Sequence, residues 1–137
     1  MLTRGDLQKL ACLRLREAEV LFAADCYDGC AYLCGYVIEL ALKAAICATL
    51  DLSDYPEGSL RGALRTHDFE DLKLLAVMGG ILSATPGRLA NWSVASRWKP
   101  ERRYEPEGTY NYAAAREILD AVRTYPDGVL ACISLRW

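Results

Sequence analysis

The chain has 137 residues, of which 53% are hydrophobic and 25% are charged, and its formal net charge is −2. This length and balance are typical of one globular domain and exclude an intrinsically disordered chain. A net charge this close to zero excludes a general electrostatic attraction to nucleic acid, so such binding has to come from a local basic patch. The first ten residues alternate charges with leucines and contain no apolar signal core, which favours a cytoplasmic location. We therefore expect a single domain over residues 1–137.

The first predicted element is an amphipathic helix that begins at Arg4 and ends at about Asp25. Thr3 and Asp6 form the pattern of a capping box just before it. Apolar residues then recur at helical spacing: Leu7, Leu10, Ala11, Ala18, Leu21 and Phe22.

The second predicted element is the long apolar helix that contains residues 30–50. Its only charges are Glu39 and Lys43, which stand one turn apart on the same face. A membrane span is one alternative for so apolar a run, but each charge near its centre would cost about 2.5–3.5 kcal/mol on insertion scales. We therefore predict no membrane span, but the central helix of a bundle in which Glu39 and Lys43 form a structural ion pair. A second interpretation is that the pair lines a cleft that holds Arg61 and His67, which are considered below as catalytic candidates.

The chain contains six cysteines and one histidine, the residue types that bind zinc in proteins. Cys26, Cys30 and Cys34 follow one another at four-residue spacing, and no C-x-x-C motif is present. This spacing and the single histidine do not match the ligand pattern of a structural zinc site, so we predict no metal and no cofactor. We interpret the cysteines as small buried hydrophobic residues, with a redox or metal role as the alternative.

The second half of the chain predicts shorter helices separated by breaks. Residues 51–62 indicate a loop, and a third helix is expected to begin near Asp68, with Asp68 or Thr66 as its N-cap. Residues 83–109 contain three prolines and no clear periodicity, which predicts a long loop of the kind that is usually functional. A final helical pattern begins near Tyr110 and is interrupted at Pro126. No segment alternates like a strand, so the expected fold is all-α, an up-and-down bundle of four to five helices.

The first candidate for chemistry is His67, the only histidine, with Arg61 and Arg65 upstream. A histidine can take the proton of a ribose 2′-hydroxyl, and an arginine can stabilise charge on a phosphate. Arg61 and His67 could together cleave RNA without a metal. The alternative is that His67 only caps or packs at the start of the third helix.

The second candidate is a basic and aromatic stretch over residues 88–104, which holds five cations and one acid. Guanidinium groups beside exposed rings suit phosphate contacts and base stacking in single-stranded RNA or a nucleotide. The alternative is that the tryptophans anchor a long loop while the arginines are solvated or paired with Glu105 and Glu107. The predicted RNA or nucleotide contacts are Arg97, Trp98, Lys99, Arg102, Arg103 and Tyr104.

Three segments of the chain carry a family resemblance, and they are residues 35–44 (GYVIELALKA), 66–72 (THDFEDL) and 98–104 (WKPERRY). Residues 35–44 are similar to the signature helix of HEPN domains, and residues 66–72 resemble the start of the third helix of that family. Residues 98–104 (WKPERRY) resemble the W-x-x-x-x-R-Y segment that precedes the last helices of many members. The segments occur in the expected order, and the similarity covers nearly the whole chain.

The resemblance implies a HEPN-like bundle of about five helices that forms a homodimer. Many members are metal-independent ribonucleases, several of them toxins paired with a nucleotidyltransferase antitoxin. Their R-x4–6-H pattern falls here on Arg61 and His67, and the resemblance implies that these residues lie at the dimer interface, in a site formed between two protomers. The chain departs from active members at Gly62, where they carry a polar residue, and from antitoxin-modified toxins at Phe69, where those have a tyrosine. The alternatives are a non-catalytic HEPN module that binds RNA, a nucleotide or a nucleotidyltransferase, and a helical scaffold without a ligand.

Overall fold

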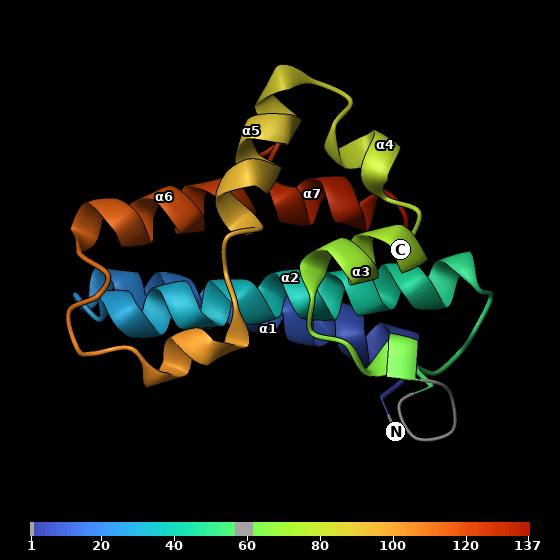
Figure 1. The fold of residues 1–137 in the computed structure, drawn as a ribbon, viewed down its shortest axis with the longest axis horizontal. Coiled ribbons are helices and arrows are strands. Elements are labelled where there is room, and N and C mark those ends of the chain that lie inside the picture. The colour runs from blue at the N-terminus through green and yellow to red at the C-terminus, as the bar shows by residue number, and fades with distance from the viewer. Residues whose placement is uncertain (1, 57–61) are drawn as a thin grey trace.

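A computed structural model describes residues 2–56 and 62–137 and confirms the all-α class (Figure 1). Within these residues there are seven α-helices and two 3₁₀-helices, and no strand beyond an isolated bridge between Thr3 and Asp54. The elements are α1 (Arg4–Ala23), α2 (Tyr27–Thr49), η1 (Gly62–Arg65), α3 (Phe69–Leu75), α4 (Gly79–Leu82), α5 (Pro86–Ala95), η2 (Pro100–Tyr104), α6 (Tyr112–Arg123) and α7 (Val129–Ser134). The described helices outnumber the four to five predicted, because the third predicted helix is divided into α3 and α4 and because α5 lies in a stretch that was predicted to be a loop.

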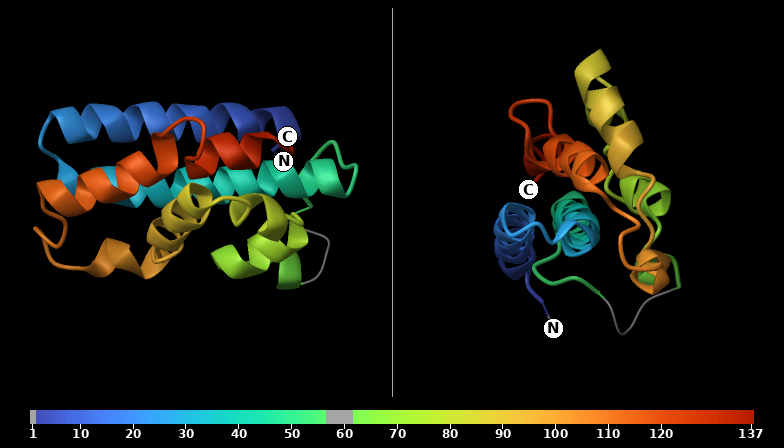
Figure 2. Two further views of the ribbon diagram at one scale, coloured as in Figure 1. Left: turned by 90° about the horizontal axis from the view of Figure 1, so that it is seen from above. Right: turned by 90° about the vertical axis from the view of Figure 1, so that its left-hand side faces the viewer.

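Helix α2 is the centre of the bundle, as predicted. It contacts α1, α3, α6, α7 and η2. Figure 2 shows α1 and the α6–α7 run lying alongside α2, with α3, α5 and η2 on another flank. By length and composition α2 could cross a membrane, but 78% of its most apolar window is buried inside the fold. Burial to this extent is typical of the core helix of a bundle.

The start signals of α1 and α3 were predicted correctly. Thr3 caps α1 through a capping box in which Asp6 N–H donates to the Thr3 hydroxyl and Thr3 N–H donates to the Asp6 carboxylate, both at 3.0 Å. Asp68 caps α3, since its carboxylate accepts from the backbone N–H groups of Glu70 at 2.9 Å and Asp71 at 3.1 Å. His67 is therefore not the cap of α3.

The prediction of a long loop over residues 83–109 was wrong, because α5 and η2 lie inside it. Thr85 caps α5 by accepting from Arg88 N–H at 3.1 Å, and Pro86 occupies the first turn. A proline is favoured there because its missing N–H would have no helical partner and its φ already suits the helix. Pro86 begins an element, whereas the sequence interpretation treated it as a break.

The predicted interruption at Pro126 is confirmed, with α6 ending before it and α7 beginning at Val129. The turn between α6 and α7 is so tight that position 128 requires a glycine, because a Cβ there would lie 2.1 Å from the Thr124 carbonyl oxygen.

The cysteines are mostly core residues. Cys30, Cys34, Cys47 and Cys132 are buried, which confirms the interpretation for four of the six, while Cys12 and Cys26 are exposed.

Candidate functional site

The single histidine lies directly against a carboxylate of the central helix. Glu39 on α2 is 5% exposed, and its Oε1 contacts Nδ1 of His67, whose side chain is 57% exposed. A neutral imidazole whose Nδ1 meets a carboxylate carries its proton at Nδ1, which leaves the lone pair at Nε2. His67 is thus an exposed imidazole in contact with a buried acid. It does not cap α3, and packing at the start of α3 stays the alternative to a role in chemistry.

Glu39 also keeps its predicted partner on the same helix. Its Oε2 lies 3.9 Å from Lys43 Nζ, and that ammonium lies 5.0 Å from the centroid of the Tyr55 ring. The Tyr55 hydroxyl donates to the Leu64 carbonyl, which ties this part of the bundle to η1. The predicted ion pair between Glu39 and Lys43 is therefore formed, and its acid contacts the histidine as well.

His67 opens onto a hollow of about 640 Å³ between the start of α3 and η2. We call it the His67 hollow. It brings together four of the predicted site residues, His67, Trp98, Lys99 and Arg103. Its other lining residues are Asp68, Phe69, Glu70, Ser96, Pro100 and Glu101.

The predicted cations divide into two kinds. Arg102 pairs with Glu105 at 3.6 Å, which bears out the paired alternative for that arginine. Arg97 is also paired, at 3.3 Å, but with Glu117, which the sequence did not indicate as a partner. Lys99 and Arg103 are exposed and form no ion pair with any residue of 2–56 or 62–137. Of the four predicted cationic contacts, the two that have no carboxylate partner within residues 2–56 and 62–137 are thus the two that line the His67 hollow.

Arg103 is surrounded by tyrosines. Its guanidinium carbon lies 4.8 Å from the centroid of the Tyr104 ring, and Tyr104 is 77% exposed. Interaction with the Tyr32 hydroxyl is the main cause that raises the pKa of Arg103. The Tyr32 and Tyr36 hydroxyls are 3.1 Å apart, and this hydrogen bond, followed by burial, raises the pKa of Tyr36 to about 12.

Sequence reasoning missed Tyr32 and Tyr36 as site residues. They stand with Glu39 and Lys43 at helical spacing on one face of α2, so together the four form a polar stripe along an otherwise apolar helix. Their helical spacing is the sequence signal from which these two tyrosines could have been predicted to lie beside Glu39 and Lys43.

Trp98 has no free face for a nucleic-acid base. It is 3% exposed and stacks on Phe69, with ring centroids 5.5 Å apart and an interplanar angle of 10°. On α2, a Cβ added at Gly35 would lie 1.8 Å from the indole. The stacking role predicted for Trp98 is wrong, and the alternative that the tryptophans anchor this segment holds for Trp98 and for Trp92, which is 5% exposed.

Arg61, the predicted partner of His67, lies outside the described residues. Among the described residues no group of three or more His, Cys, Asp or Glu side chains could hold a metal ion.

No family model matches the chain, and comparisons with curated proteins and with solved structures also find no match. The HEPN resemblance therefore depends on the three sequence segments alone, and a function has to be argued from the side chains of the His67 hollow.

Proposed function

We propose that this chain is a HEPN-like domain that binds RNA or a nucleotide in the His67 hollow. The observation that carries the proposal is the presence of Lys99 and Arg103, without carboxylate partners in the described chain, beside His67 in one hollow. At about 640 Å³ the hollow is within the usual size of ligand sites.

The side chains suit a phosphate ester better than another anion. An arginine grips two phosphate oxygens with its planar fork, and a lysine adds a point charge. Tyr104 offers an exposed ring beside Arg103, on which a base can stack. A ligand with both phosphates and bases uses all three groups.

Acidic side chains also line the hollow, but two of the three are engaged. Asp68 accepts two backbone N–H groups at the start of α3, and Glu70 pairs with Lys73 at 2.6 Å. Glu101 is exposed. Engaged carboxylates repel a phosphate less than unengaged ones, so the two unpaired cations dominate the attraction.

Binding is tested by fluorescence anisotropy with an unstructured, labelled RNA oligonucleotide over a range of salt concentrations. Arg103→Ala is expected to weaken binding about tenfold. The slope of log K against log salt concentration is expected to fall by about 1, which corresponds to one phosphate contact. Arg97→Ala is the matched control, because it removes the same charge from an arginine paired with Glu117 outside the hollow. Equal weakening by both variants would indicate general electrostatics, and no effect of Arg103→Ala would overturn the proposal.

Metal-independent RNA cleavage is a second candidate function, favoured by the contact between Glu39 and His67. With Nδ1–H held by Glu39, Nε2 can take the proton of a ribose 2′-hydroxyl. The 2′-oxygen then attacks the adjacent phosphorus, forming a cyclic phosphate, and the bond to the 5′-oxygen breaks with that oxygen taking up a proton. Lys99 and Arg103 would stabilise charge on the non-bridging oxygens.

Cleavage is tested in EDTA with wild type, His67→Ala and Glu39→Gln. His67→Ala is expected to abolish cleavage, whereas Glu39→Gln is expected to lower kcat with little change in KM, because Glu39 positions the histidine and does not touch RNA. If wild type and His67→Ala cleave equally, the activity belongs to a contaminant and the catalytic assignment fails, while the binding proposal stands on the Arg103 experiment.

A further inference from the structure

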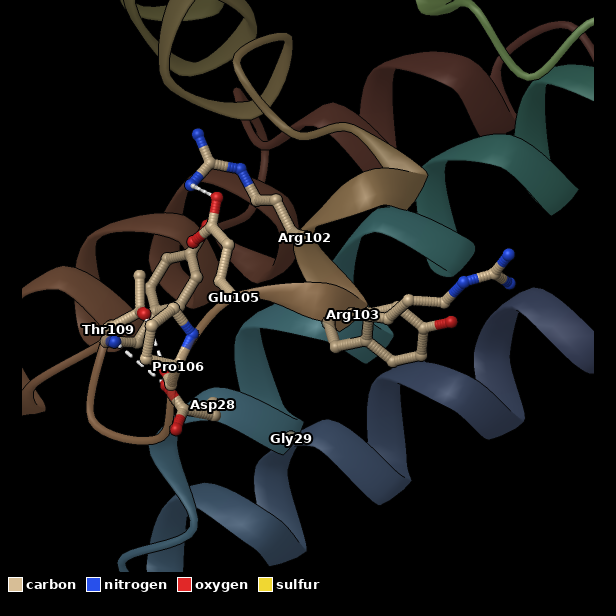
Figure 3. Close-up of a pocket in the computed structure, with 9 residues that line it drawn as sticks. Asp28, Gly29, Arg102, Arg103, Glu105, Pro106 and Thr109 are labelled. Carbon is tan, nitrogen blue, oxygen red and sulfur yellow. Dashed lines mark hydrogen bonds and ion pairs between the residues drawn. The ribbon is translucent and has the colours of Figure 1, made fainter.

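A second hollow lies beside η2, at the N-terminal end of α2. It has a volume of about 330 Å³, and we call it the Tyr110 hollow (Figure 3). Its lining residues are Asp28, Gly29, Tyr32, Arg102, Arg103, Glu105, Pro106, Thr109 and Tyr110. It therefore combines two aromatic rings with cations and carboxylates.

The walls of the Tyr110 hollow are held in place by specific contacts. The Asp28 carboxylate accepts from the backbone N–H groups of Gly108 and Tyr110, both at 2.8 Å, and so fastens the connection before α6 to α2. Arg102 lies over the Tyr110 ring, with its guanidinium carbon 5.6 Å from the ring centroid, and pairs with Glu105 at 3.6 Å. A planar group entering here meets a preformed arrangement of ring and guanidinium.

Arg103 belongs to both hollows, since it lines the Tyr110 hollow as well as the His67 hollow. Figure 3 shows its side chain extending away from Arg102 and Glu105. A ligand that places a phosphate on the Arg103 guanidinium thus has a hollow available on either side of that contact.

The two hollows meet at Arg103, but their far ends, at Asp28 and at His67, are farther apart than one nucleotide reaches. Tyr32 borders the Tyr110 hollow, and Glu39, which holds His67, follows seven residues later on α2, which is about 10 Å at 1.5 Å per residue. Asp28 stands one further turn away, at about 16 Å from Glu39. A mononucleotide cannot hold its base beside Asp28 and Tyr110 and also place its phosphate against His67.

We infer that the Tyr110 hollow is a nucleobase subsite for the same strand that occupies the His67 hollow. The ligand is then single-stranded RNA of at least two nucleotides, whose backbone crosses Arg103, and a mononucleotide fills only part of the site. Aromatic rings and arginine planes receive bases without regard to sequence, and the carboxylates of Asp28 and Glu105 accept from base N–H groups. This inference rests on the proposed function and specifies its ligand.

The test compares a 5′-mononucleotide with a tetranucleotide of the same base by titration calorimetry. The wild type is expected to bind the tetranucleotide at least tenfold more tightly, in line with the stacking of one further base. Thr109→Trp fills the Tyr110 hollow from an exposed position and is expected to remove that gain, so that the tetranucleotide binds no more tightly than the mononucleotide. Glu107→Trp is the matched control, because it adds the same ring at an exposed position of the same connection that does not line the hollow.

Circular dichroism establishes that the variants remain folded, and Tyr110→Leu is a second variant with the same expected loss. If Thr109→Trp and Tyr110→Leu keep the full tetranucleotide affinity while Arg103→Ala loses it, the subsite inference fails and the proposed function stands. If Arg103→Ala binds like the wild type, or the wild type binds neither ligand, both fail.

Discussion

Replacing Gly35 with alanine is expected to destabilise the protein, although alanine is the better helix former. The added Cβ would lie 1.8 Å from Cε2 and 2.0 Å from Cδ2 of Trp98. The indole cannot retreat easily, because its ring stacks on Phe69 at 5.5 Å and the whole side chain is 3% exposed. Both segments that meet here, α2 and the stretch leading to η2, would have to shift.

The magnitude follows from two opposing terms. Overpacking a core costs about 1–3 kcal/mol, and so severe an overlap belongs at the upper end. Alanine returns about 1 kcal/mol through its helix propensity. The net loss is about 2 kcal/mol, which for a domain of this size lowers Tm by about 6–10 °C.

Urea unfolding followed by circular dichroism measures this loss directly. Gly29→Ala is the matched control on the same helix, because its Cβ would meet only the flexible end of Leu21 at 3.2 Å. Gly29→Ala is expected to be neutral or slightly stabilising. A Gly35→Ala variant as stable as Gly29→Ala would refute the placement of Trp98 against α2, and with it the geometry of the His67 hollow.

Three further predictions concern stability. Lys43→Met is expected to lower the free energy of unfolding by about 3 kcal/mol in urea, because it leaves the buried Glu39 carboxylate without its ammonium partner; an unchanged midpoint would contradict this. Asp68→Ala is expected to cost about 1 kcal/mol and Asp68→Asn much less, since asparagine still caps α3, so equal losses would exclude capping as the cause. The Thr3 backbone N–H lowers the pKa of Asp6, so this carboxylate stabilises the fold fully above its unfolded pKa of about 3.9, and that contribution is lost as the pH falls through the lower pKa of the folded state. The stability difference between wild type and Asp6→Asn is therefore expected to shrink as the pH falls below about 4, and a constant difference would contradict it.

The central helix could be predicted from the sequence, and so could the local start signals. Residues 30–50 carry two charges and otherwise apolar or small side chains, which only a largely buried helix accommodates. The caps at Thr3 and Asp68 depend on residues three positions away or fewer, so their signals are contained in a short stretch of sequence. The same kind of signal was present at Thr85 and Pro86, but the other prolines nearby made that stretch resemble a loop.

The candidate site depends on contacts between residues far apart in the chain. Glu39 and His67 are 28 positions apart, and their contact exists only because the start of α3 packs against the middle of α2. No local sequence pattern predicts such a contact, although the polar stripe on α2 lies on the face where the contact occurs.

The sorting of the cations also required the tertiary structure. Arg97 and Arg103 look alike in sequence, but α6 brings Glu117 to Arg97, while the described chain brings no carboxylate into an ion pair with Arg103. Burial within the central helix and the position of the basic segments follow from composition and periodicity, which are local properties of the sequence. The charges that remain available to a ligand follow from the fold, because an ion pair depends on which helices lie side by side.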